Sequence, residues 1–91
     1  MNQRSFPFSE IKVSPDVYER IFDEDLDPEE LKWHRDDEDR RVKANFQTDW
    51  KIQLDNALPV SLENEVFIPK GVYHRLIKGS GDLIVTVKKI I

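Results

Sequence analysis

The chain contains no cysteine, which excludes disulfide bridges, thiolate catalysis, zinc fingers and cysteine-bound iron–sulfur clusters. It has no apolar run that approaches the ~18 residues needed to cross a bilayer, so we expect no membrane span. The segment from Met1 to Phe8 is short, polar and interrupted by Pro7, which is unlike a signal peptide. Together these absences predict a cytoplasmic protein.

A surplus of basic residues is also missing. The 91 residues include 14 Lys and Arg against 18 Asp and Glu, for a net charge of −4. Nucleic-acid binding needs Lys and Arg concentrated on one face, so we expect no nucleic-acid partner. A chain of this length forms one domain with a small core, and a dimer contact would add buried surface.

The first third of the chain has two local patterns. Phe6, Phe8, Ile11 and Val13 are apolar residues between polar ones, which predicts an edge strand because Pro7 cannot donate to a central ladder. The tripeptide at 14–16, Ser-Pro-Asp, is typical of a helix start. Apolar residues at 17, 18, 21 and 22 then recur at helical spacing, so we expect a short helix there, although a strand with aromatic residues fits the same pattern.

From residue 42 onward the hydrophobic pattern has a period of two. Before it, the run at 35–41 is too polar to be buried and is expected to form a loop. Alternating or fully apolar segments separated by turns occur at 42–46, 50–54, 60–62, 66–68, 73–77 and 83–87. Many short strands at such spacing predict an all-β sandwich or small barrel.

The segment at 64–74, NEVFIPKGVYH, resembles the second conserved motif of the cupin family, G(X)5PXG(X)2H(X)3N. Pro69, Gly71 and His74 match the Pro, Gly and His of that motif. A turn that needs glycine for its backbone angles, followed by a strand with one imidazole, agrees with this comparison. Two positions depart from the motif, with Glu63 for its opening Gly and Lys78 for its closing Asn.

The first cupin motif, G(X)5HXH(X)3,4E(X)6G, is matched only in part. When it is aligned on His34, Asp36 stands at the second His position, and Arg40 or Arg41 stands at the Glu position. No Gly follows where the motif has one.

The resemblance implies a small double-stranded β-helix barrel of the jelly-roll type, and cupins are often dimers. We therefore expect one domain over 1–91, with an N-terminal arm at 1–30, a barrel at 31–89 and at most one or two short helices. A homodimer is the expected assembly.

His34, Asp36 and His74 form the candidate metal site. Two imidazoles and one carboxylate are the ligand set of a facial-triad iron site, and the i, i+2 spacing of His34 and Asp36 places both side chains on one face of a strand. The resemblance matches both histidines to ligand positions. Iron, manganese, nickel or zinc are candidate ions. Against this, a guanidinium from Arg40 in the pocket would repel a divalent cation and pair with Asp36, as in a barrel that has lost its metal.

Other residues are candidates for ligand binding or catalysis. His74 is a candidate general base, as in metal-free sugar isomerases and epimerases of the cupin fold. Gln53 and Arg40 are expected to line the pocket, Arg75 to bind an anion, and Trp50 to stack on a ring.

We therefore predict a small cupin-like barrel that binds a small ligand or divalent metal without strong catalytic activity. A cupin enzyme that uses His74, either metal-dependent or of the isomerase type, is the first alternative. A structural or assembly domain with a vestigial pocket is the second.

Overall fold

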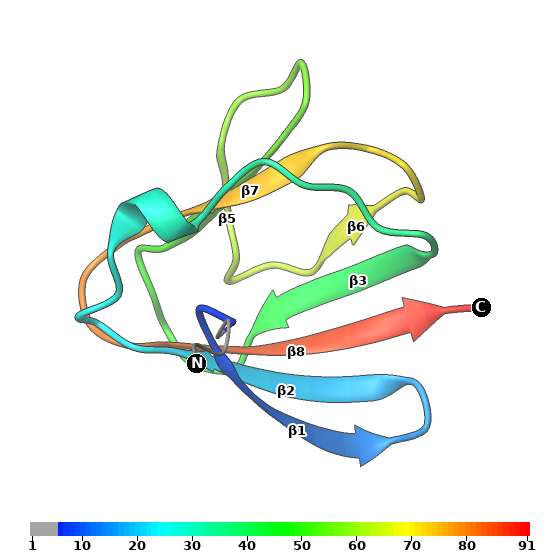
Figure 1. Cartoon of the computed structure of the whole chain (residues 1–91), viewed down its shortest axis with the longest axis horizontal. Helices are drawn as coiled ribbons and strands as arrows, with labels where there is room; N and C mark the ends of the chain where they lie inside the picture. Colours follow the sequence, from blue (N-terminus) through cyan, green and yellow to red (C-terminus); the bar gives the residue numbers. More distant parts are fainter. Residues whose placement is uncertain (1–5) are drawn as a thin grey trace, which may run out of the picture.

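The computed structural model describes residues 6–91, and within them it places all regular structure in two antiparallel sheets apart from one 3₁₀ turn, η1 (Pro28–Glu30) (Figure 1). The first sheet has the strand order β1-β2-β8-β3-β6 and the second the order β5-β4-β7. The strands are β1 (Ser9–Ser14), β2 (Val17–Phe22), β3 (Asp39–Ala44), β4 (Lys51–Leu54), β5 (Val60–Ser61), β6 (Val66–Ile68), β7 (His74–Ile77) and β8 (Leu83–Ile90). The predicted all-β class is confirmed. No helix in the described part of the chain is long and apolar enough to span a membrane.

The predicted short helix at 14–22 is wrong. Residues 15 and 16 form the turn of a hairpin, and β2 pairs with β8 from Val17 opposite Lys88 to Phe22 opposite Leu83. The hydrogen bonds that β2 forms with β8 stabilise the strand more than a helix of about two turns could, because so short a helix is marginally stable by itself. The predicted edge strand is confirmed as β1, which pairs only with β2. The predicted arm thus contributes two strands to the larger sheet, and its residues 1–5 lie outside the described part.

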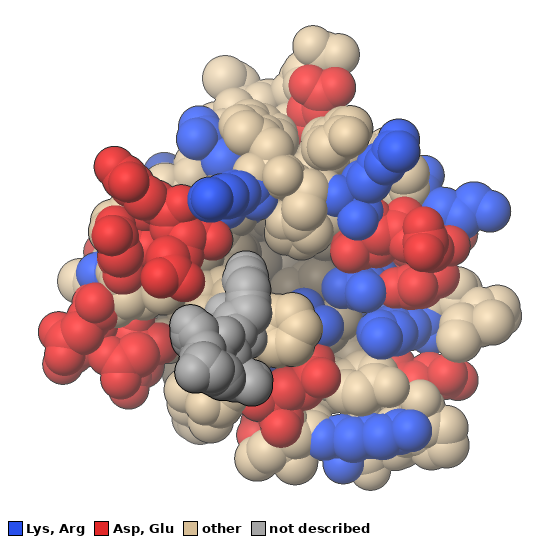
Figure 2. Space-filling view, viewed as in Figure 1, with Lys and Arg blue, Asp and Glu red and all other residues tan. Residues whose placement is uncertain are grey.

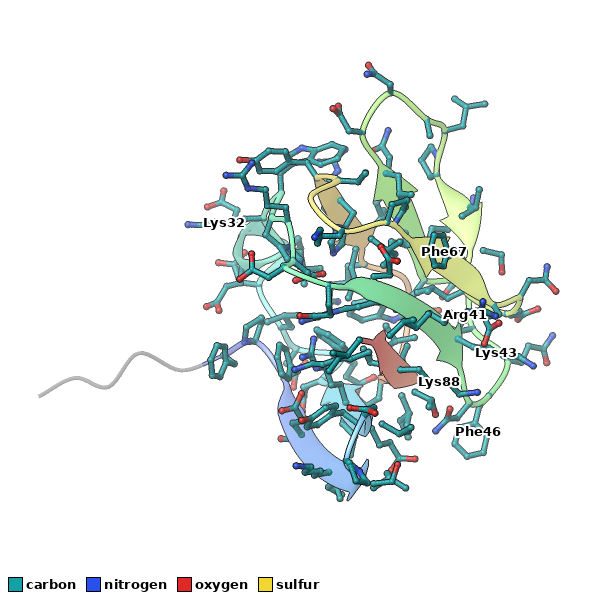
Figure 3. The ribbon with its side chains drawn as sticks, turned by 90° about the vertical axis from the view of Figure 1, so that its right-hand side faces the viewer. Lys32, Arg41, Lys43, Phe46, Phe67 and Lys88 are labelled. Atoms are coloured by element: carbon teal, nitrogen blue, oxygen red, sulfur yellow. The ribbon has the colours of Figure 1, made fainter. Side chains whose placement is uncertain are left out.

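The polar run at 35–41 is a loop only as far as residue 38. Strand β3 begins at Asp39, where the backbone starts to pair with β8, and from Arg40 onward it also pairs with β6. Alternation along β3 turns Arg41 and Lys43 outward, where Figure 3 shows both side chains pointing away from the barrel. Phe67 on β6 lies on the same outer face and is 47% exposed, so the fully apolar segment at 66–68 is buried on one face only, although such a segment suits a strand buried on both.

The core lies between the two sheets and consists of the inward residues of each strand. Its fully or almost fully buried members are Phe22, Val42, Ala44, Trp50, Ile52, Leu62, Ile68, Leu83, Val85 and Val87. Trp50 has no exposed surface, and its indole N–H donates to the Gly81 carbonyl at 3.0 Å. That bond satisfies the single polar atom of the largest core side chain and fixes the loop between β7 and β8 against the core.

Candidate metal centre

The backbone brings His34 and His74 together. His34 lies on the connection between η1 and β3, and His74 is the first residue of β7. Each residue donates its backbone N–H to the other's carbonyl, at 3.0 and 2.9 Å, which forms an isolated antiparallel bridge. The expected strand around His34 is reduced to this one pair. The bridge places the two imidazole rings edge to face, with centroids 4.3 Å apart.

The ring nitrogens of both histidines have defined roles. Nδ1 of His34 lies 3.0 Å from the Lys32 carbonyl, and Nδ1 of His74 lies 2.9 Å from the Val72 carbonyl. A carbonyl oxygen only accepts, so each Nδ1 bears the hydrogen. In the neutral imidazole, Nε2 then carries a lone pair, which is the form in which histidine binds metal ions.

Asp36 completes the cluster. The candidate ligand atoms of His34, Asp36 and His74 all lie within 4.8 Å of one another. The loop that contains the matched cupin motif holds the Asp36 backbone, since the Gly71 N–H donates to the Asp36 carbonyl at 3.0 Å. Gly71 has φ +81°, the left-handed value expected at that turn. The structure thus brings together the three side chains that the sequence analysis selects as the candidate metal site.

The carboxylate of Asp36 has one oxygen without a hydrogen bond. Oδ2 is buried and lies 3.2 Å from His74 Nε2, but it has no well-aligned donor among the described residues. Burial raises the pKa of Asp36, but the contact with His74 and the positive charge of Arg40 lower it by more, so the net pKa lies below its usual value. An ionised oxygen and two imidazole lone pairs facing each other repel unless a cation or a proton lies among them.

Arg40 lies beside this cluster and not within it. Its Nη1 is 3.4 Å from Asp36 Oδ1, the oxygen that faces away from His74, and its Nε donates to Glu38 at 2.6 Å. The guanidinium therefore orients Asp36 while a second carboxylate neutralises its charge. The choice between the two arginines is also resolved: Arg40 lines the cavity, and Arg41 points outward, 3.7 Å from Glu65.

The cluster lies in the wall of a cavity of about 420 Å³ between the sheets. Figure 2 shows the molecule hollowed at its middle, with acidic side chains gathered on one side and mixed charges on the other. The residues that line the cavity are Phe6, Pro7, Phe8, Arg20, Phe22, Glu30, Leu31, Lys32, His34, Asp36, Arg40, Val42, Ile52, Ile68, His74, Leu76, Val85 and Val87.

Three predicted ligand-binding residues do not line this cavity. Gln53 faces away from the cavity, because its neighbour Ile52 on β4 faces into it. Arg75 on β7 pairs with Gln53 and faces away from the cavity for the same reason. Arg75 donates from Nε and Nη2 to Gln53 Oε1 at 3.1 and 3.0 Å and lies over the Trp33 ring. Trp50 is enclosed in the core. Arg40 alone of the four predicted residues lines the cavity.

The apolar lining was missed by sequence reasoning. Leu76 and Val42 follow His74 and Arg40 by two positions on β7 and β3, so they face the same cavity. The period-two pattern contains this signal, but alternation alone does not distinguish side chains that line a cavity from those that fill a core.

No protein-family model matches the sequence, and no curated protein matches it. Solved structures do. A cupin domain from Bordetella pertussis is 16% identical, with a TM-score of 0.59 over 100% of this chain and 99% of the other. A cupin-2 domain protein from Shewanella frigidimarina is 19% identical, with a TM-score of 0.61 over 99% and 85%. An iron(II) form of HppE in complex with its substrate is 11% identical, with a TM-score of 0.65, and this chain covers 56% of it. At these identities the likeness concerns the fold.

Proposed function

We propose that this chain, which has the cupin fold, binds one divalent transition-metal ion through His34, Asp36 and His74. Two imidazoles with one carboxylate and open positions are the ligand set typical of non-haem iron(II), so Fe²⁺ is the ion we assign first. The iron(II) in HppE, which has the same fold, supports this choice. Manganese, nickel and zinc are the competing ions.

The observation that carries the proposal is the buried, unpartnered Oδ2 of Asp36. It faces the Nε2 atoms of two histidines whose Nδ1 atoms are held by backbone carbonyls. Carbonyl contacts of this kind orient metal-bound histidines in known sites. The donor set therefore fits a metal ion.

The surrounding residues position the ligands. The bridge between His34 and His74 fixes the two imidazoles through their backbones, and Arg40 holds the far oxygen of Asp36. A bound ion would supply a Lewis acid next to a partly open cavity whose lining is largely apolar. His74 Nε2 is then occupied, so the predicted role of His74 as a general base belongs to the metal-free alternative, in which a neutral His74 can take a proton and then pair with Asp36.

Metal content tests the proposal. Purified protein is loaded with Fe²⁺ under anaerobic conditions, desalted and measured by elemental analysis, and Mn²⁺, Ni²⁺ and Zn²⁺ are compared in parallel. We expect about one equivalent per chain in the unmodified protein, since three protein ligands hold one ion. Asp36→Asn and His34→Ala should retain less than about a tenth of that amount, because loss of a ligand weakens affinity more than the ~10–100-fold loss seen for outer-shell changes.

The matched control is Glu29→Gln, which removes one exposed carboxylate from η1 and leaves the cluster intact. It should bind as much iron as the unmodified protein. Retention of less than about a tenth of an equivalent by the unmodified protein would remove the metal proposal in favour of the protonated His74–Asp36 pair. Full retention by Asp36→Asn would show that the ion binds elsewhere.

A further inference from the structure

The cavity is divided into a polar end and an apolar end. On β7, His74 is followed two positions later by Leu76, and on β3, Arg40 is followed by Val42. Residues two apart on a strand face the same side, so each strand passes from a polar to an apolar side chain along its own wall of the cavity, β3 in the larger sheet and β7 in the smaller one.

Strand register extends the apolar end across both sheets. Leu76 lies opposite Ile52 on β4, and Val42 lies opposite Val87 on β8. All four side chains line the cavity. At about 420 Å³, its volume is near the lower end of the usual range for small-molecule sites. The space therefore suits a small molecule with a single polar head and an apolar body.

The charges of the wall decide the sign of that head. Arg20 and Arg40 both line the cavity, but each is paired with a carboxylate at 2.6 Å, Arg20 with Glu10 and Arg40 with Glu38. Pairs this close contribute little net charge to the cavity.

The remaining lining charges are those of Lys32, Glu30 and Asp36. Lys32 and Glu30 are both exposed and opposite in sign, so their charges cancel. Asp36 therefore leaves the metal-free cavity with one net negative charge, and a divalent ion on the ligands changes it to one net positive charge. An anionic head is repelled in the first state and attracted in the second, inside walls of low dielectric.

We infer that the metal-loaded cavity binds a small apolar monocarboxylate, with its carboxylate at the His34–Asp36–His74 end and its chain against Leu76, Ile52, Val42 and Val87. This inference rests on the proposed metal site. Because coupling between two ligands is reciprocal, the carboxylate should tighten metal binding by the same factor as the metal tightens carboxylate binding.

Calorimetric titration with hexanoate tests the inference on protein with and without Fe²⁺, under anaerobic conditions. We expect hexanoate to bind at least about tenfold more tightly to the iron-loaded protein, a factor typical of coupled sites. Hexanol, which has no charge, should bind with the same affinity in both states. Acetate, which keeps the head and lacks the chain, should bind at least about tenfold more weakly than hexanoate, since each buried methylene adds affinity.

A pair of variants separates the chain contact from the metal. Leu76→Gln places an amide at the apolar end, whereas Leu58→Gln makes the same change at an exposed position between β4 and β5 that does not line the cavity. We expect Leu76→Gln to weaken hexanoate binding about tenfold or more while both variants keep one iron per chain. If Leu76→Gln does not fold, the comparison of hexanoate with acetate and hexanol in the unmodified protein remains decisive.

The outcomes distinguish the two proposals. One iron per chain with equal hexanoate affinity in both states overturns this inference and leaves the metal site standing. The same holds if a folded, iron-loaded Leu76→Gln protein binds hexanoate normally. Absence of iron binding overturns the proposed function and this inference with it.

Discussion

Metal binding should raise the melting temperature of this chain, and His34→Ala should remove most of that rise. An ion that binds only the folded state stabilises it by about 2.7 kcal/mol at a free concentration of ~100 times its dissociation constant. A domain of 60–100 residues gains about 4–8 °C in melting temperature per kcal/mol. We therefore expect a rise of roughly 11–22 °C in differential scanning calorimetry.

His34 is the informative ligand to remove because its side chain is exposed while its backbone forms the bridge. An exposed substitution changes stability by about 0.5 kcal/mol or less, so the metal-free melting temperature should shift by at most ~4 °C. His74 is only 4% exposed, and its replacement would itself destabilise the core. A metal-dependent rise of full size in His34→Ala would refute the ligand assignment, and a large loss of stability without metal would refute the exposed, separable role of that side chain.

Three further predictions concern stability and assembly. Gly79→Ala should destabilise the fold by about 1–3 kcal/mol in urea titration, because its Cβ would overlap Asp49 Oδ1 and lie 2.7 Å from the Trp50 backbone N; a change within experimental error would contradict this close packing. Hydrogen bonds from the backbone and hydroxyl of Ser80 hold the pKa of Asp49 below its usual value of 3.8, so its stabilisation is complete above that pH and is lost as the pH falls through the lowered pKa. Asp49→Asn should therefore be less stable at neutral pH and lose less stability on acidification, and parallel acid unfolding curves would contradict this. The predicted homodimer is tested by sedimentation of Ile11→Lys, which charges the exposed edge strand β1: we expect a shift toward monomer, whereas an unchanged dimer excludes this edge as the contact and a monomeric unmodified protein excludes the dimer.

The candidate metal site could be predicted because its signals are local in the sequence. The spacing of Pro69, Gly71 and His74 defines a turn before a strand, and the His-x-Asp pair supplies the other two ligands. The structure places the three candidate ligand side chains together. Sequence could not show that the pairing partner of His34 is His74 itself, since a single bridge between distant residues leaves no periodic pattern.

The errors arose where the sequence permits two local structures. Apolar residues at 17, 18, 21 and 22 fit one face of a helix, and the proline at 15 is equally at home in a hairpin turn or a helix start. Pairing with β8 decided between them, and that pairing joins segments far apart in the chain. Gln53 was expected to line the pocket because alternation alone does not say which face of a strand is inward for a polar residue.

The paired amides of His34 and His74 offer a direct way to observe the site without a ligand. Because each amide is protected by the other residue's carbonyl, their hydrogen–deuterium exchange rates should change together whenever the connection at 31–38 separates from β7. Exchange of these two protons, resolved by NMR, would give the fraction of molecules whose imidazoles are correctly placed. A substitution that changes the exchange rates of both amides equally alters the opening of the connection at 31–38. A substitution that leaves both exchange rates unchanged affects only the side chains of the site.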